Sequence, residues 1–140
     1  MSEAGEAGVG VVIVGHGDTA SRLLAAARAI VGEGPLDDVA AIDAGAGQTP
    51  ALTASIVEAL AAADRGEGVL LIVDLLGASP CMCGLREGAR RRLALLAGLN
   101  LAMLLKLATL DRARLSAREV AEACADSAQR SGSVRAAGVM

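Results

Sequence analysis

The sequence predicts an α/β fold: an open, mostly parallel, doubly wound sheet in the strand order 2-1-3-4, with helices on both faces. Three observations predict it. Short runs of apolar, β-branched residues alternate with longer segments of helical periodicity, glycine-rich turns separate them, and two of the runs end in polar residues. This alternation is typical of parallel sheets, because each parallel connection needs a crossover that is usually a helix.

The first strand and helix are predicted near the start of the chain. Residues 9–15 form a continuous apolar run, which predicts a strand buried on both faces of a sheet. Residues 19–31 carry apolar side chains at helical spacing. After a glycine-containing turn, residues 39–42 predict a short second strand.

The next helix and strand follow a glycine-rich loop. Thr49 as N-cap and Pro50 at the first helical position predict a helix over residues 51–63. Residues 69–73 are a run of valine, leucine and isoleucine, which predicts a third buried strand ending at Asp74.

The second half of the chain begins with another cap. Ser79 and Pro80 predict a helix that continues to about Arg92. We expect the fourth strand at residues 97–101 and a short helix at residues 102–110.

The last helix carries a capping box. Ser116 is followed three residues later by Glu119, which predicts a helix over residues 116–129. Residues 133–139 predict a weak final strand or a tail, and a swapped, antiparallel strand is one form that this segment can take.

The composition predicts one domain over residues 1–140, with a flexible N-terminus at 1–8 and a C-terminal strand or tail at 131–140. Hydrophobic residues make up 54% of the chain, enough for a sizeable core. The formal net charge is −3, and basic residues are not interleaved with aromatic ones, so we expect no nucleic-acid partner. Without a signal peptide or an apolar stretch of about 20 residues, the chain is expected to be cytoplasmic.

The three cysteines, Cys81, Cys83 and Cys124, do not predict a disulfide framework, because their number is odd. A zinc site needs about four nitrogen or sulfur ligands, and the chain has only one histidine. We therefore expect no metal and interpret the cysteines as small thiols that are buried or half-buried on helices.

A candidate site follows from the predicted sheet. In open parallel sheets, ligands bind outside the carboxyl ends of the strands, where the strand order reverses. In the order 2-1-3-4 the first and third strands are neighbours at that point. The first is followed by His16 and the third by Asp74, so these side chains are predicted to face each other.

These residue types favour chemistry on the histidine. A histidine with one unprotonated ring nitrogen is a nucleophile, and a carboxylate on the other nitrogen fixes the tautomer and stabilises the cation formed on attack. The small residues Gly77 and Ala78 lead with Ser79 into a predicted helix N-terminus, where free N–H groups can hold phosphate oxygens. We therefore predict phosphoryl transfer, with His16 and Asp74 catalytic and residues 77–79 binding phosphate.

Three motifs follow one another along the chain: Val-Gly-His-Gly at residues 14–17, Asp-Leu-Leu-Gly-Ala-Ser-Pro at residues 74–80 and Asn-Leu-Ala-Met-Leu at residues 100–104. In this order they resemble the IIA subunit of the mannose family of bacterial phosphoenolpyruvate-dependent sugar phosphotransferase systems. The family pattern has serine in place of Gly15 and a second glycine in place of Ala78. It also often has Phe-Asn where Cys81 begins the Cys-Met-Cys sequence.

The resemblance implies a phosphoryl relay. It implies that His16 accepts phosphate from the phosphocarrier HPr, as a phosphohistidine, and passes it to a IIB subunit, without a cofactor. Asp74 would orient His16, and residues 77–79 would cradle the phosphate. It also implies a homodimer that exchanges C-terminal strands, and indirect association with the membrane components IIC and IID.

Other functions stay open at the level of sequence. The chain is also compatible with a regulatory phosphoprotein that has no dedicated sugar, or with the phosphotransfer subunit of dihydroxyacetone kinase, which has the same fold. Short tetrapyrrole metal chelatases also begin with a strand ending in Val-Gly-His-Gly, but no second histidine is present here as a ligand.

Overall fold

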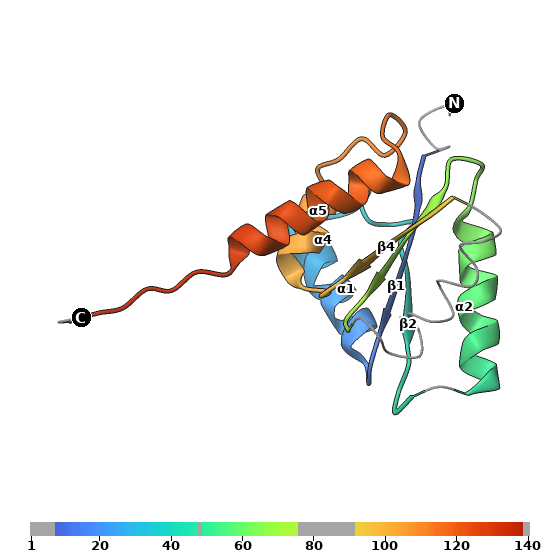
Figure 1. Ribbon diagram of the computed structural model, residues 1–140, viewed down its shortest axis with the longest axis horizontal. Helices are drawn as coiled ribbons and strands as arrows, with labels where there is room; N and C mark the ends of the chain where they lie inside the picture. The colour runs from blue at the N-terminus through green and yellow to red at the C-terminus, as the bar shows by residue number, and fades with distance from the viewer. Residues whose placement is uncertain (1–7, 48, 76–91, 139–140) are drawn as a thin grey trace.

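The computed structural model describes residues 8–47, 49–75 and 92–138. Its centre is a parallel sheet in the order β2-β1-β3-β4, shown in Figure 1. The strands are β1 (Gly10–Gly15), β2 (Ala40–Asp43), β3 (Val69–Val73) and β4 (Leu93–Ala97). Each neighbouring pair is parallel. The predicted fold class and strand order are therefore confirmed.

Helices cover both faces of the sheet (Figure 1). One face packs against α1 (Thr19–Val31), α4 (Leu101–Leu107) and α5 (Ala117–Ser131), and the other against α2 (Pro50–Ala63). Successive side chains of a strand point to opposite faces, so β1 contributes to two separate cores. Val11 and Ile13 belong to the core under α1, α4 and α5, whereas Val12 and Val14 belong to the core under α2.

The prediction for the fourth strand was wrong. We expected it at residues 97–101, but β4 ends at Ala97. Gly98 has a φ of +92°, a conformation that favours glycine and breaks the strand. Asn100 then caps α4, its side-chain oxygen accepting a hydrogen bond from the backbone N–H of Met103 at 2.9 Å. The helix ends at Leu107, earlier than the predicted residue 110.

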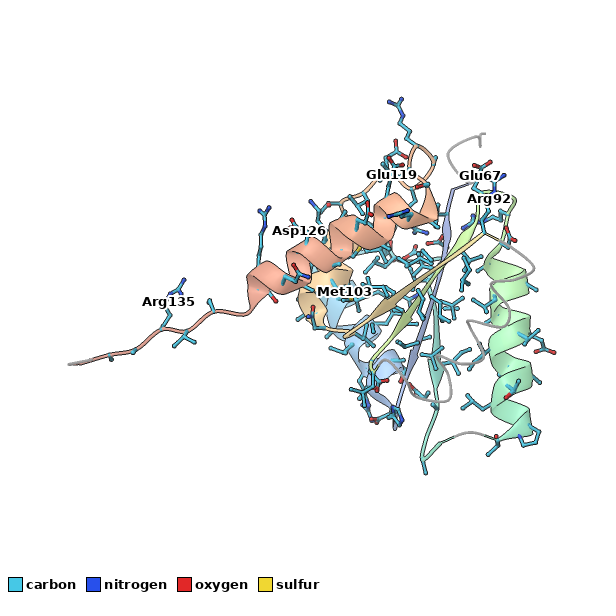
Figure 2. All side chains as sticks on the ribbon, viewed as in Figure 1. Glu67, Arg92, Met103, Glu119, Asp126 and Arg135 are labelled. Atoms are coloured by element: carbon cyan, nitrogen blue, oxygen red, sulfur yellow. The ribbon has the colours of Figure 1, made fainter. Side chains whose placement is uncertain are left out.

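Arg92 lies directly before β4. The backbone carbonyl of Arg92 accepts a hydrogen bond from the N–H of Val69, at the start of β3. Arg92 is therefore not helical, and the rest of the segment for which we predicted a helix, from Ser79 onward, lies outside the described residues. At this end of the sheet, Glu67 and Arg92, both labelled in Figure 2, line the same pocket.

Both ends of the chain differ from the simplest expectation. Gly8 is buried, and a Cβ there would lie 2.8 Å from the backbone of Arg112, so the flexible N-terminus does not include it. Residues 1–7 lie outside the described residues. At the other end, residues 132–138 form no strand within this single chain. They extend away from the body as an exposed tail, on which Figure 2 labels Arg135.

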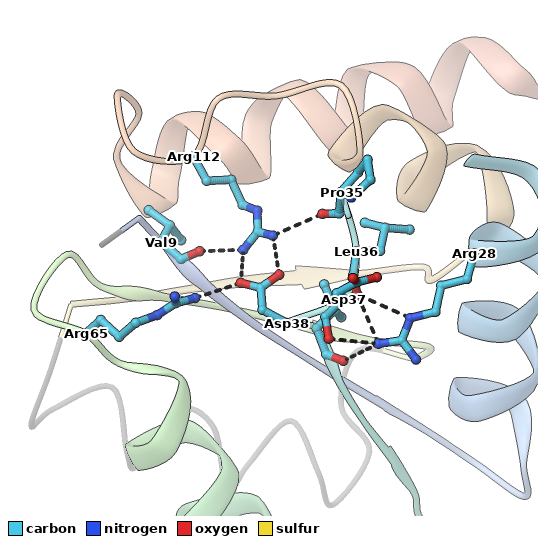
Figure 3. A network of polar contacts seen from close by, with 9 residues as sticks. Val9, Arg28, Pro35, Leu36, Asp37, Asp38, Arg65 and Arg112 are labelled. Carbon is cyan, nitrogen blue, oxygen red and sulfur yellow. Dashed lines mark hydrogen bonds and ion pairs between the residues drawn. The ribbon is translucent and has the colours of Figure 1, made fainter. Parts of the chain in front are cut away.

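A network of hydrogen bonds and ion pairs connects several segments at the end of the sheet where β1 and β2 begin (Figure 3). Arg112 donates hydrogen bonds to the carbonyl oxygens of Val9 and Pro35, at 2.8 and 3.3 Å. It also donates to both carboxylate oxygens of Asp38, one of which accepts a further bond from Arg65 at 2.7 Å. The network joins the segment before β1, the segment before β2 and the loop before α5.

Candidate functional site

His16 and Asp74 meet at the carboxyl end of the sheet. β1 and β3 are neighbours, and Val14 pairs with Val73, so the residues that follow the two strands emerge side by side. The ring Nδ1 of His16 lies 3.1 Å from Oδ2 and 3.2 Å from Oδ1 of Asp74. The backbone N–H of His16 also donates to Oδ2, at 2.8 Å. The structure thus brings together the two residues that the strand order predicted to face each other.

This contact decides which ring nitrogen of His16 is available for chemistry. An ionised carboxylate can only accept hydrogen bonds, so the ring holds its proton on Nδ1. The lone pair of a neutral imidazole then lies on Nε2, away from Asp74. The side chain of His16 is 40% exposed and that of Asp74 is 20% exposed. His16 can therefore act as a nucleophile through Nε2 while Asp74 accepts the hydrogen bond from Nδ1.

Asp74 is kept ionised by its hydrogen bonds. Partial burial would raise the pKa of Asp74, but the backbone N–H and the ring of His16 and the backbone N–H of Leu75 more than compensate. The pKa of Asp74 therefore lies below its ordinary value. A permanent negative charge beside Nδ1 favours the positive charge that the ring acquires when Nε2 forms a bond.

The backbone around His16 is also held from the side of β2. The N–H of Ala44 donates to the carbonyl of Gly15 at 2.8 Å. Gly17 and Gly45 form an isolated antiparallel bridge, with N···O distances of 2.9 and 3.3 Å. Both glycines have a φ near +60°, a conformation that other residues rarely adopt. The turn that carries His16 is consequently attached to both neighbouring strands.

The first turn of α1 begins three residues after His16. The hydroxyl and the backbone N–H of Thr19 both donate to the carbonyl of His16, at 2.7 and 3.1 Å. In the same turn, Ser21 donates to Asp43 from its backbone N–H and from its hydroxyl. Sequence reasoning did not identify these three residues. The available signal was that Asp43, like Asp74, stands at the carboxyl end of a strand.

The residues predicted to bind phosphate, Gly77, Ala78 and Ser79, lie outside the described residues, as do Cys81 and Cys83. Cys124 is fully buried among apolar side chains, and burial raises its pKa to about 11. A thiol in this environment stays protonated at neutral pH, so Cys124 is a core residue and not a nucleophile.

Two further properties concern the described residues as a whole. Nowhere in residues 8–47, 49–75 and 92–138 do three or more histidine, cysteine, aspartate or glutamate side chains gather as a metal site would require. Within the same ranges, no helix combines the length and the apolar character needed to cross a membrane.

Known structures share this fold. The mannose/sorbose-specific IIA subunit of a phosphotransferase system from Enterococcus faecalis matches with 26% identity and a TM-score of 0.79, over 95% of this chain and 98% of that chain. The component EIIA from Streptococcus agalactiae matches with 23% identity and a TM-score of 0.74, over 90% and 96%. A IIA protein associated with the fucose utilization operon of Streptococcus pneumoniae matches with 22% identity and a TM-score of 0.68, over 89% and 97%.

No curated protein matches the chain significantly. The sequence does match the model of a known family. The model of the EIIA-man family, described as the PTS system fructose IIA component, matches residues 10–125, which include β1, His16, Asp74 and most of α5. This match covers most of the 140 residues, and the chain therefore belongs to the EIIA-man family of phosphotransferase-system IIA components.

Proposed function

We propose that this IIA component carries a phosphoryl group on Nε2 of His16, accepting it from HPr and passing it to a IIB subunit. Components of this family in general relay phosphate between HPr and IIB. The observation that carries the proposal is the hydrogen bond between Nδ1 of His16 and Asp74, which leaves Nε2 as the free nucleophile of a partly exposed ring.

The transfer step needs no external base. The Nε2 lone pair of His16 forms a bond to phosphorus, while the bond from phosphorus to its donor atom on HPr breaks and that atom keeps the electron pair. The proton on Nδ1 stays in place, and the positive charge of the ring is stabilised by the carboxylate of Asp74. Transfer to IIB is the same step in the opposite sense, with an acceptor atom of IIB as the nucleophile.

The rest of the site completes the proposal. Gly77, Ala78 and Ser79 follow Asp74 closely in the chain, and their backbone N–H groups and the serine hydroxyl are suited to hold phosphate oxygens. The relay requires no metal or other cofactor, since the phosphohistidine itself stores the group. The protein works in the cytoplasm, as a homodimer, and meets the membrane components IIC and IID through IIB.

The relay is tested by reconstituting it. Incubation with phosphoenolpyruvate, enzyme I and HPr is expected to label the protein with acid-labile, base-stable phosphate, as phosphohistidine should be. Because His16 is the only histidine, His16→Ala is expected to remove all of this label. An unlabelled wild-type protein, or full labelling of His16→Ala, would contradict the proposal.

The same experiment separates the relay from the metal chelatase considered above. A chelatase would use His16 as a metal ligand and would take no phosphate from HPr. The family match and the engagement of Nδ1 by Asp74 both support the relay.

A further inference from the structure

The first turn of α1 has no side-chain cap from its own N-cap residue. The first four N–H groups of a helix have no partner within the helix and are often bonded by the N-cap side chain. Here Asp18 occupies the N-cap position but makes no side-chain hydrogen bond to the helix backbone. Its carboxylate instead pairs with Arg22, at 3.0 Å. The first turn contains no acidic residue that could take over this role.

Asp43 supplies the missing acceptor from the end of β2. Its Oδ1 accepts a hydrogen bond from the backbone N–H of Ser21 at 2.9 Å, and its Oδ2 accepts one from the hydroxyl of Ser21 at 2.5 Å. These bonds, the hydroxyl bond most of all, lower the pKa of Asp43, so it is ionised at neutral pH. A negative charge at this end of a helix is also favoured by the helix dipole.

The two hydrogen bonds between Asp43 and Ser21, called the clamp from here on, lie next to the backbone contacts that hold the turn around His16. Asp43 is the strand partner of Gly15, and the next two residues, Ala44 and Gly45, bond to Gly15 and Gly17. The residues on each side of His16 are thus fixed to the end of β2, while His16 itself is fixed to Asp74 after β3. The orientation of the ring depends on both attachments.

We propose that Asp43 is a positioning residue for phosphoryl transfer: through Ser21 it fixes the start of α1, and thereby keeps Nδ1 of His16 on Asp74 and Nε2 directed outward. This inference rests on the proposed function of His16. Loss of the clamp lets the turn and the ring sample other orientations, and at metal-bound histidines the loss of such an outer contact typically costs roughly ten- to a hundredfold in metal affinity or activity. Because Asp43 is exposed, we expect the lower figure, about tenfold.

Two variants of Asp43 and one distant control test the proposal. Asp43→Ala removes both hydrogen bonds and is expected to lower the rate of phosphorylation by HPr about tenfold. Asp43→Asn keeps an oxygen for the N–H of Ser21 and presents an N–H₂ to its hydroxyl, so it is expected to recover most of the rate. Recovery by asparagine would show that hydrogen bonding, more than charge, positions the turn.

Ser116→Ala is the matched control. It removes an equivalent contact at the start of α5, where Ser116 and Glu119 form a capping box with bonds of 2.9 and 3.1 Å. Ala117 lies beside Gly68, just before β3, at the end of the sheet opposite His16. This variant is expected to lose a similar amount of thermal stability and to keep the wild-type rate of phosphorylation.

The ring nitrogens of His16 provide a readout that does not depend on phosphorylation. The chain has one histidine, so a protein labelled with ¹⁵N-histidine gives one set of ring signals. The wild type and Ser116→Ala are expected to show the tautomer with the proton on Nδ1. Asp43→Ala is expected to show a raised population of the tautomer with the proton on Nε2.

The outcomes separate the two proposals. If the wild type accepts no phosphate, the relay fails, and the ring signals still decide whether Asp43 positions His16. The positioning role would be overturned if Asp43→Ala kept the wild-type rate, or lost rate with unchanged ring signals. A tenfold loss in Ser116→Ala would overturn it as well, because the effect would then follow stability alone.

Discussion

At the scale of the residue, the candidate site has one histidine after β1 and two carboxylates, one from each of the strands that flank β1. Asp74 contacts the ring of His16 directly, whereas Asp43 acts through the first turn of α1. Both carboxylates have a lowered pKa because N–H or O–H groups donate to them. The arrangement leaves Nε2 of a partly exposed ring as the candidate nucleophile in an otherwise fixed turn.

Asp74→Asn tests the role of the charge beside His16. Asparagine can still accept the bond from Nδ1, but it lacks the negative charge that stabilises the ring when Nε2 is phosphorylated. We expect the rate of phosphorylation by HPr to fall roughly a hundredfold, the upper end for loss of a contact that orients a reactive histidine. The rate is measured with the protein at a fixed concentration of phosphorylated HPr. An unchanged rate would show that orientation suffices and that the charge of Asp74 has no role.

The sequence alone predicts His16 and Asp74 as neighbours but does not predict the contact between Ser21 and Asp43. His16 and Asp74 could be predicted because each directly follows a buried strand, and the topology places the ends of those strands together. Ser21 and Asp43 could not, because their hydrogen bonds join residues 22 positions apart that show no local pattern. The contact exists only once β2 has paired with β1.

At the scale of the element, the strands that are buried on both faces were the most predictable. β1 begins and ends with glycine, β3 is an apolar run between Gly68 and Asp74, and every residue of both strands is buried. β4 was misplaced because residues 93–105 are apolar almost throughout, so periodicity does not separate strand from helix. Only Gly98 and Asn100 mark the boundary, the first through its positive φ and the second as a cap.

The network around Asp38 predicts how acid acts on the opposite end of the sheet. Burial would raise the pKa of Asp38, but the hydrogen bonds and charges of Arg112 and Arg65 outweigh it, and the pKa is lowered. A carboxylate with a lowered folded pKa stabilises the fold above its unfolded pKa, about 3.9. That contribution is lost as the pH falls through the lower, folded value.

Asp38→Asn is therefore expected to reduce the free energy of unfolding at pH 7 by about 1 kcal/mol, a modest value because the side chain of Asp38 is 36% exposed. The free energy of unfolding should also fall less steeply in this variant than in the wild type as the pH drops below about 4, where the contribution of the paired carboxylate is lost. Urea unfolding at each pH measures both effects.

Asp126→Asn is the control for this comparison. Among the residues that the structure describes, Asp126 pairs with Arg130, one helical turn away on α5, at 3.1 Å. Pairs of this kind contribute little, so the variant should unfold like the wild type at every pH. If Asp38→Asn behaved in the same way, the network would have no share in the acid sensitivity of the fold.

At the scale of the whole molecule, the tail after α5 and the open edge of the sheet are complementary. β4 is the last strand of the sheet, so one side of it has no neighbouring strand in the order that the structure describes. Unpaired edge strands attract further strands. Residues 132–138 are extended and exposed, and the side chain of Val134 is 87% exposed. An extended segment of this kind can pair with the sheet of a second copy.

We therefore expect the protein to form a homodimer in which the tails are exchanged, and removal of residues 132–140 to convert it to a monomer. Light scattering after size-exclusion chromatography should give about twice the mass of one chain, 13.9 kDa, for the wild type, and about one chain mass for the truncated form. Arg135→Pro keeps the length of the tail but disturbs strand pairing, because proline lacks the backbone N–H, and it should weaken the dimer as well. A monomeric wild type, or a truncated form that stays dimeric, would exclude exchange of the tails as the basis of assembly.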